Sequence, residues 1–219
     1  LIIFVTYYNL NTNIWQLNGN MKIQKFKNNI IVIDNFYKHP HKIRNFALNN
    51  TFKPHNTLYK TMFLNTDFTS RKNKKFIKTL ENIENISIDT NIWDNNIGKE
   101  SNGYLQYLTK TGKPTIHSDG LQRSCIVYLH PQPPKNSGTL FFQHKKTKTL
   151  KETFETFHTV NADLNDSSKW KTHFTCINKF NRAILFYGNL YHASEGGFGE
   201  NLNNARLYQT FFYEKNLNN

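Results

Sequence analysis

The chain has 219 residues and a formal net charge of +13, because 28 lysines and arginines stand against 15 aspartates and glutamates. Its length fits one domain with a full core, and its two cysteines exclude a disulfide-stapled scaffold and a cysteine zinc site. An aromatic share of 15% argues against disorder, and no apolar stretch is long enough to span a membrane. So few cysteines favour a reducing compartment, and we expect a cytoplasmic protein.

The first twenty residues differ in character from the rest of the sequence. They contain no charged residue, and the apolar run 1–5 lacks both the length and the basic flank of a signal peptide. Met21 is the first plausible start, and regular patterning begins soon after it. We therefore predict that residues 1–20 are a leader or upstream translated sequence outside the core, with an edge strand as the alternative. Residues 21–219 are predicted to form a single domain.

The next part of the chain combines a buried strand with helices. Residues 30–34 have the apolar character of a buried strand, and Pro40 opens a helix over 41–49. An extended piece is expected over 59–64. A helix over 71–82 should follow, capped by Thr69 or Ser70, with its lysines facing solvent.

From residue 103 onward the pattern changes to short segments rich in aromatic and β-branched residues, separated by Gly, Pro and Asn turns. One helix, over 150–157, is expected to interrupt them. The pattern predicts a mainly β fold, a sandwich or jelly roll with the N-terminal helices packed outside it. The expected strands cover residues 103–109, 123–130, 138–143, 170–179, 182–187 and 205–213.

Three side chains form a candidate metal site. His117 and Asp119 are two residues apart between expected strands, so on an extended backbone they point the same way and can reach one ion. His192 follows an apolar strand and a Gly turn. Two histidines and one carboxylate that leave coordination positions open make the facial triad of non-haem Fe(II) oxygenases. Taken singly, the first pair could be an ordinary surface loop and His192 a structural histidine.

Arg206, at the start of the last expected strand, is a candidate anion-binding residue. Alternation places it on the same side as Tyr208 and on the side opposite to Leu207. A buried, inward-facing arginine needs an anionic partner. The carboxylate of 2-oxoglutarate would serve, as a bidentate pair, and a surface acid such as Glu195 or Glu200 is the ordinary alternative.

In this order on β-strands, His117-x-Asp119, His192 and Arg206 resemble the Fe(II)/2-oxoglutarate dioxygenases, specifically the prolyl-4-hydroxylase-like branch. Further segments are similar to a group of bacterial and phage proteins of that superfamily, so the resemblance covers roughly residues 29–214. These segments are Val32–Tyr37, Pro40–Ala47, Gly138–Lys145, Asn178–Ala183 and Arg206–Phe212.

The resemblance implies a double-stranded β-helix, a cupin-like jelly roll with the metal at one open end. His117, Asp119 and His192 would hold Fe(II), with 2-oxoglutarate and dioxygen as co-substrates. Arg206 would bind the distal carboxylate of 2-oxoglutarate, a position where many members of the branch have lysine.

The resemblance also implies a tyrosine that contacts the same carboxylate from the strand before the His-x-Asp motif. Tyr107 is the nearest match, although its spacing to His117 differs from that of the relatives. Tyr104 and Gln106 therefore remain rivals for this wall of the co-substrate pocket.

The implied activity is hydroxylation of a protein side chain or a small molecule, coupled to oxidative decarboxylation of 2-oxoglutarate. One alternative is a nucleic-acid oxidative demethylase of related fold, and another is an inactive β-sandwich binding module. The net charge favours a nucleic-acid partner only weakly, because an Asn- and Lys-rich composition is also what an AT-rich coding sequence produces. We expect no membrane partner.

Overall fold

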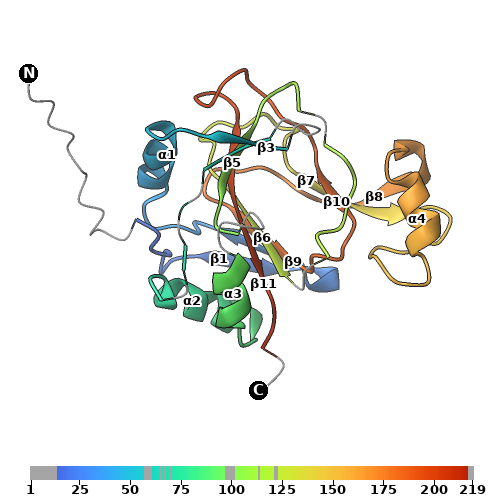
Figure 1. The fold of residues 1–219 in the computed structure, drawn as a ribbon, viewed down its shortest axis with the longest axis horizontal. Coiled ribbons are helices and arrows are strands. Elements are labelled where there is room, and N and C mark those ends of the chain that lie inside the picture. Colours follow the sequence, from blue (N-terminus) through green and yellow to red (C-terminus); the bar gives the residue numbers. More distant parts are fainter. Residues whose placement is uncertain are drawn as a thin grey trace, which may run out of the picture.

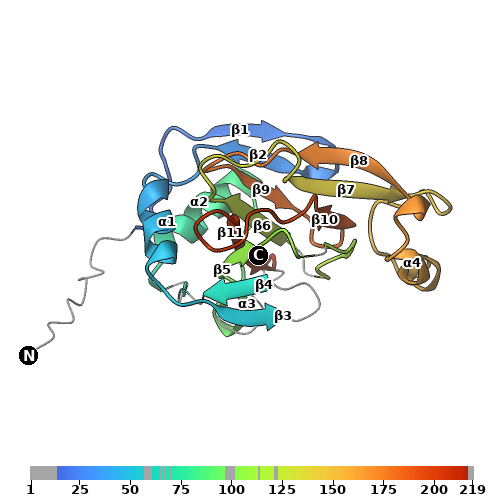
Figure 2. The same ribbon diagram turned by 90° about the horizontal axis from the view of Figure 1, so that it is seen from above.

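The structure, a computed structural model, describes residues 14–56, 61–64, 66, 68–69, 71–96, 102–112, 114–120 and 123–216. Two antiparallel sheets form its body, as Figure 1 and Figure 2 show. The larger sheet has the strand order β1-β2-β9-β6-β11-β5-β4-β3, and the smaller one β10-β7-β8. The larger sheet consists of β1 (Lys22–Lys25), β2 (Ile31–Asp34), β9 (Ala183–Phe186), β6 (Arg123–Tyr128), β11 (Arg206–Tyr213), β5 (Leu105–Leu108), β4 (Thr61–Leu64) and β3 (Lys53–Asn56). The smaller sheet consists of β10 (His192–Ser194), β7 (Thr139–His144) and β8 (Trp170–Cys176).

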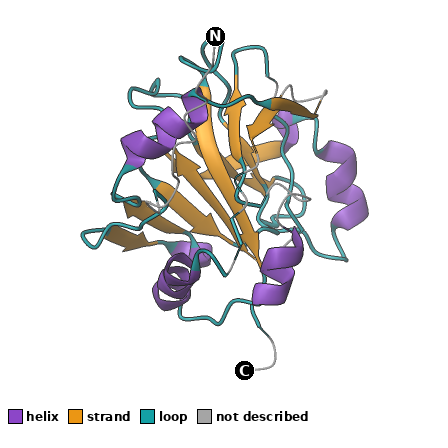
Figure 3. Ribbon diagram, turned by 60° about the vertical axis from the view of Figure 1, so that its left-hand side comes forward, coloured by secondary structure: helices purple, strands orange, loops and turns teal. Residues whose placement is uncertain are grey.

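The helices lie outside the strands, as Figure 3 shows. In Figure 1, α1, α2 and α3 gather at one side of the molecule and α4 stands apart at the opposite end. No helix in the described part of the chain has both the length and the apolar character of a membrane span. The helices are α1 (Pro40–Leu48), α2 (Lys74–Glu84), α3 (Thr90–Asn96) and α4 (Phe157–Asp163), with short 3-10 turns η1 (Lys27–Asn29) and η2 (Ser167–Lys169).

The two faces of the larger sheet serve two different cores. Successive side chains of a strand point to opposite faces, and residues paired across neighbouring strands share a face. One face, here called the helix-covered face, packs Leu207 and Phe211 of β11 against residues of α1, α2 and α3 such as Leu80 and Trp93. The other, here called the inner face, meets the smaller sheet. Its core combines Ile30, Val32, Tyr128, Ile184 and Phe186 with Phe141 and Cys176 of the smaller sheet.

This arrangement confirms the predicted fold class, a mainly β jelly roll with helices outside it. The buried strand over 30–34 is present as β2, and the helix over 41–49 as α1. The basic helix begins later than expected, at Lys74, with Asn73 as its N-cap residue instead of Thr69; Ser70 lies outside the described residues. The first two residues of the extended piece expected over 59–64 also lie outside them, and the rest forms β4.

The helix expected over 150–157 is wrong. Helix α4 starts only at Phe157, and the residues before it are held by pairing with a distant segment. Lys151 forms an isolated β-bridge with Leu190, and the Glu152 N–H donates to the carbonyl of Asn189 at 2.8 Å. The backbone groups that a helix would use are therefore occupied by this bridge, and tertiary pairing overrides the local preference.

The predicted leader needs a partial correction. Residues 1–13 lie outside the described residues, but residues 14–20 contact the domain. The Trp15 ring packs edge-on against Tyr37, Phe46 and Phe68, with ring centroids 5.4 to 6.4 Å apart. Leu17 forms a β-bridge with Tyr37. The packed domain thus begins before Met21.

Asp34 at the end of β2 provides a pH-dependent link to the turn before β9. Its carboxylate accepts hydrogen bonds from Arg182 Nε at 2.6 Å and from Lys179 Nζ at 2.9 Å. Mainly because of the Arg182 bond, and in spite of partial burial, the pKa of Asp34 falls to about 2. A carboxyl whose pKa is lower in the folded than in the unfolded chain contributes stability above the unfolded value of about 3.9, and loses it as the pH falls through the folded value.

We therefore expect Asp34→Asn to lower the free energy of unfolding by about 1 to 2 kcal/mol at pH 7, after allowance for solvent screening. Urea unfolding at pH 7 and at a pH near 2 measures this. The difference between variant and parent should fall to about a few tenths of a kcal/mol at the lower pH, where the folded carboxyl is half protonated. Glu200→Gln, which breaks the solvent-exposed ion pair with Lys110, is the control and should change the free energy of unfolding less than Asp34→Asn does at pH 7. An unchanged difference at low pH would contradict the ionic origin of the effect.

Candidate metal centre

The structure brings together the three side chains that the sequence singled out as a metal site. Ligand atoms of His117, Asp119 and His192 all lie within 4.8 Å of one another. His117 and His192 form an isolated antiparallel bridge, with backbone N–H···O bonds of 3.0 and 2.9 Å in the two directions. The Asp119 N–H donates to the carbonyl of Gly188 at 2.7 Å. Backbone pairing of the 117–119 segment with 188–192 therefore sets the positions of all three.

Hydrogen bonds fix which nitrogen each histidine presents to the site. Nδ1 of His117 lies 2.8 Å from the carbonyl of Thr115, and Nδ1 of His192 lies 2.8 Å from the carbonyl of Leu190. A carbonyl only accepts, so each Nδ1 carries the proton and each Nε2 keeps a free lone pair. The two Nε2 atoms face the Asp119 carboxylate, at 3.6 Å for His117 and 3.5 Å for His192. Metal-binding histidines are usually oriented in this way, with the N–H of the outer ring nitrogen donating to a backbone carbonyl or a carboxylate.

The donor set and spacing fit a small divalent ion. Bonds of about 2.1 Å at right angles put neighbouring ligand atoms about 3 Å apart, so each histidine Nε2 would have to approach the Asp119 carboxylate by about half an ångström. Burial lowers the pKa of His192 to about 4, which leaves its ring neutral and able to ligate. Burial opposes ionisation of Asp119, but the neighbouring His192 and His117 and a hydrogen bond from Ser124 hold its pKa below the ordinary value. Burial opposes a charge on His117, but Asp119 and the Thr115 carbonyl raise its pKa above the ordinary value. An ion would therefore displace a proton from this ring, and the donor set would then be two imidazoles and one carboxylate.

Ser124 on β6 orients the carboxylate and was not singled out from the sequence. Its hydroxyl donates to Asp119 Oδ2 at 2.6 Å, and the residue is 1% exposed. Ser124 pairs with Phe186 across β9 and with Phe212 across β11, so it lies on the inner face. A lone serine in a strand carries no signal in the sequence, because only its distance to Asp119 gives it a role.

We expect Ser124→Ala to weaken binding of a divalent ion by about 10-fold, because losing a hydrogen-bond partner of a metal ligand costs about 10- to 100-fold in affinity. Titration with Mn(II), followed by the loss of free-ion EPR signal, measures this. Ser124→Thr keeps the hydroxyl and is the matched control, with affinity near that of the parent. Equal losses in both variants would mean that packing, and not the hydrogen bond, supports the site.

Arg206 is buried on the inner face, 2% exposed. Its Nε and Nη2 donate to the carbonyls of Ser137 and Gly138 at 3.0 and 3.3 Å, and its guanidinium lies 5.5 and 4.7 Å from the ring centroids of Tyr128 and Tyr208. Within the described residues, no carboxylate forms an ion pair with it.

The two acids named as ordinary partners of Arg206 are engaged elsewhere. Glu200 pairs with Lys110 at 2.6 Å, and Glu195 accepts from the Gly138 N–H at 3.1 Å. A buried guanidinium without a protein carboxylate is suited to an anion from outside.

Of the three residues expected to share the co-substrate wall, the structure separates Tyr107 from the other two. Tyr107 pairs with Leu207, and its ring meets Phe52 at 5.1 Å within the core under the helices. It therefore lies on the helix-covered face, and its proposed role is wrong. Strand pairing decides this, because one residue of shift along a strand exchanges the two faces.

Gln106 and Tyr104 are on the correct side of the sheet. Gln106 pairs with Tyr208 across the strands, and its amide donates to Thr210 Oγ1 at 2.7 Å. Tyr104 stacks on Phe63 with centroids 4.7 Å apart, and Phe63 is the partner of Gln106 on β4. Both therefore share the inner face with Arg206.

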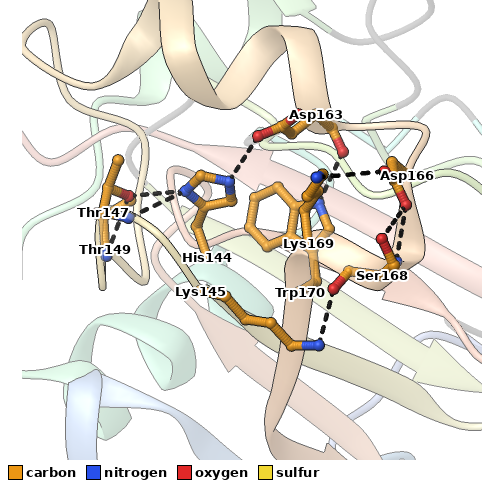
Figure 4. Close-up of polar contacts among 9 residues, drawn as sticks. All are labelled: His144, Lys145, Thr147, Thr149, Asp163, Asp166, Ser168, Lys169 and Trp170. Atoms are coloured by element: carbon orange, nitrogen blue, oxygen red, sulfur yellow. Dashed lines mark hydrogen bonds and ion pairs between the residues drawn. The ribbon is translucent and has the colours of Figure 1, made fainter.

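A second histidine–acid pair lies outside the metal centre and is structural. Figure 4 shows His144 between Asp163 and Thr147, with Nε2 at 3.0 Å from the carboxylate and Nδ1 at 2.9 Å from the hydroxyl. Both ring nitrogens are thus occupied. The Trp170 indole also donates to the Asp163 carbonyl at 2.9 Å, which ties the end of α4 to the smaller sheet.

The segment between β7 and β8, which includes α4, also packs against the residues that carry the metal centre. Val160 of α4 and Trp170 pack in one core cluster with Ile116 and Tyr191, the residues directly before the two site histidines. Glu152, in the same segment between β7 and β8, accepts a hydrogen bond from Ser118, which lies between His117 and Asp119. This segment therefore contacts both parts of the chain that carry the site, residues 116–119 and residues 190–192.

Solved structures share this architecture. HygX from Streptomyces hygroscopicus, with nickel and 2-oxoglutarate bound, matches 86% of this chain and 83% of its own at 13% identity, with a TM-score of 0.57. The chain has the fold of HygX. A second HygX structure, with nickel, 2-oxoglutarate and hygromycin B bound, gives a TM-score of 0.54 at 12% identity with the same coverage. A prolyl 4-hydroxylase from Phytophthora capsici is more distant, with a TM-score of 0.47 at 13% identity over 86% of this chain and 59% of that one.

No family model and no curated protein matches the sequence. The structural likeness therefore establishes the fold, and the function has to be argued from the side chains of the site.

Proposed function

We propose that this protein is an Fe(II)- and 2-oxoglutarate-dependent dioxygenase of the prolyl-4-hydroxylase-like branch, acting as a hydroxylase of a protein side chain or a small molecule. One observation carries the proposal. Two histidines and a carboxylate converge in a fold whose inner face also buries Arg206, an arginine without a carboxylate partner in the described chain. HygX, which shares the fold, binds nickel and 2-oxoglutarate.

In this proposal His117, Asp119 and His192 hold Fe(II) through one face of its coordination sphere. Three protein ligands leave three positions open for the co-substrates. When bound, the iron supplies the oxidative chemistry, in which dioxygen is consumed and 2-oxoglutarate is decarboxylated to succinate. The protein supplies position and exclusion of water.

Arg206 binds the distal carboxylate of 2-oxoglutarate in this proposal. Its remaining donor capacity and its charge favour a planar anion, and the rings of Tyr128 and Tyr208 shield it from solvent. The Tyr128 hydroxyl donates to Thr139 Oγ1 at 2.7 Å, which keeps that ring in place beside the guanidinium. A charge-assisted pair is stronger in such a water-poor setting than at a surface.

Apolar rings form the dry side of the proposed pocket. The centroid of the His192 ring lies 4.7 Å from that of Phe186 and 6.0 Å from that of Phe141, both of which are fully or almost fully buried. His117, by contrast, has a side chain that is 49% exposed, so the site opens to solvent on its side. A substrate would approach from there. The proposal includes a single domain that works in the cytoplasm. The two free, buried cysteines are compatible with the reducing conditions there.

The test uses the purified protein loaded anaerobically with Fe(II). Adding 2-oxoglutarate should produce a weak visible charge-transfer band, and admitting air should then yield succinate. Glutarate, which lacks the keto group, is the control and should give neither signal. The absence of both the band and the succinate would reject the proposal and favour a binding module that has the fold without the activity.

A further inference from the structure

Two adjoining hollows lie beside the metal centre on the surface of the molecule. Their volumes are about 190 and 480 Å³, and Asn29 and Tyr187 line both. The first is bounded by the end of β1, the start of β6 and the C-terminal segment near Lys215. The second is bounded by the turn over 148–151 and by the segment that leads to His192. Because they share two lining residues, the hollows adjoin, and the two together are called the groove here.

The groove is strongly basic. Lys25, Arg123 and Lys215 line its first part, and Lys148 and Lys151 line the second. Among the described lining residues the single acid is Glu84, so five positive charges stand against one negative charge, an excess of four.

Glu84 does not offset the lysines of the groove. It is buried in an ion pair with Arg123 and accepts a hydrogen bond from the Tyr213 hydroxyl. The charge that the groove presents to a ligand is therefore mainly that of Lys25, Lys148 and Lys151.

An exposed aromatic ring stands at the centre of this charge. The Tyr187 side chain is 40% exposed although it directly follows the buried strand β9, and the Arg123 guanidinium lies 4.5 Å from its ring centroid. Phe26, in the first hollow, is 41% exposed. Asn28, Asn29 and Asn189 line the same groove, and side-chain amides offer both donors and acceptors, although the Asn28 amide also contacts Nε2 of His173 at 3.1 Å. Cations along a channel, rings for stacking and amides for base edges are the features that single-stranded nucleic acid recognition uses.

The wall of the groove is also the support of the metal centre. Tyr187, Asn189 and Leu190 line the groove. In the same turn, the Gly188 carbonyl accepts a hydrogen bond from the Asp119 N–H, and the Leu190 carbonyl accepts one from Nδ1 of His192. A ligand in the groove therefore lies against the same four-residue turn that positions the site.

We propose that this groove binds single-stranded nucleic acid, with its lysines contacting phosphates and a base stacking on Tyr187. An acidic peptide would satisfy the lysines but brings no row of planar bases to stack on the ring. This inference goes beyond the proposed function, and binding can be measured without iron, so the two can fail separately.

The test titrates a fluorescently labelled 12-nucleotide oligothymidylate with metal-free protein at several salt concentrations and follows the fluorescence anisotropy. We expect binding that weakens linearly on a log–log plot as salt rises, as counterion release requires. Lys25→Glu with Lys151→Glu should lower the affinity at least about tenfold and reduce the salt slope by at least about 1. Tyr187→Ala should lower it about tenfold, and Tyr187→Phe should retain it because the ring remains.

The matched control reverses two charges outside the groove. Lys74 and Lys75 are exposed on α2, and the double change to glutamate should lower the affinity by less than about threefold. Equal losses in the groove and helix variants would mean that net charge alone attracts the strand, and would overturn the proposal. So would Tyr187→Ala binding like Tyr187→Phe, or polyglutamate competing as well as unlabelled oligothymidylate. Thermal unfolding of each variant verifies that it is folded.

Discussion

Asp119→Ala is expected to lower the affinity for Fe(II) or Mn(II) by more than about 100-fold and to abolish succinate formation. The change removes the one carboxylate that the described residues bring to the site and leaves two imidazoles, one of them 49% exposed. Losing a partner that merely orients a ligand already costs about 10- to 100-fold, so losing a ligand should cost more. Titration with Mn(II) under EPR and succinate measured by mass spectrometry provide the two readouts.

Asp94→Ala, at an exposed position of α3, is the matched control and should keep both metal affinity and activity. Asp119 is only 15% exposed, so the thermal unfolding midpoint of its variant has to be measured as well. Metal affinity that stays within a few-fold of the parent in folded Asp119→Ala would show that the three side chains do not form a metal site. A loss of affinity together with unfolding would be resolved by Asp119→Asn, which keeps the shape and removes the charge.

Short-range geometry explains why much of the site was predictable. The spacing of His117 and Asp119 determines that both side chains point the same way on extended backbone, and the structure brings both to His192. Alternation along β11 likewise places Arg206 on the side of Tyr208 and away from Leu207, and Leu207 belongs to the core under the helices. Each of these inferences depended on a local backbone rule.

The failures have a different origin, which is pairing between distant segments. Three of the four residues of β5 are buried, so its sequence has no polar face to show which side Tyr107 occupies. Only the register with β11 decides this. The bridge between Lys151 and Leu190 similarly prevents the helix expected over 150–157, and the packing of Trp15 on Phe46 and Phe68 extends the domain before Met21.

The second large effect concerns Arg206. Arg206→Gln should raise the KM for 2-oxoglutarate by about 100- to 1,000-fold, because it removes a charge and the geometry of a bidentate pair in a buried setting. A glutamine amide can still donate toward the carbonyls of Ser137 and Gly138, so the cost to the fold is limited. Arg206→Lys keeps the charge without the planar fork and should raise KM by about tenfold. Steady-state kinetics of succinate formation, with 2-oxoglutarate varied, measures both.

Three quantities distinguish co-substrate binding by Arg206 from a purely structural role: KM for 2-oxoglutarate, Mn(II) affinity and the unfolding midpoint. In the described part of the chain Arg206 hydrogen-bonds to the carbonyls of Ser137 and Gly138 and to no metal ligand, so Mn(II) affinity should equal that of the parent in both variants. If the arginine served only to pack between Tyr128 and Tyr208, both variants would lower the unfolding midpoint and leave KM unchanged. If the guanidinium binds the co-substrate carboxylate, KM for 2-oxoglutarate should rise from the parent to Arg206→Lys and further to Arg206→Gln, while metal affinity stays constant. A purely structural role does not produce this order. An unchanged KM in folded Arg206→Gln would contradict the proposed binding of 2-oxoglutarate by Arg206.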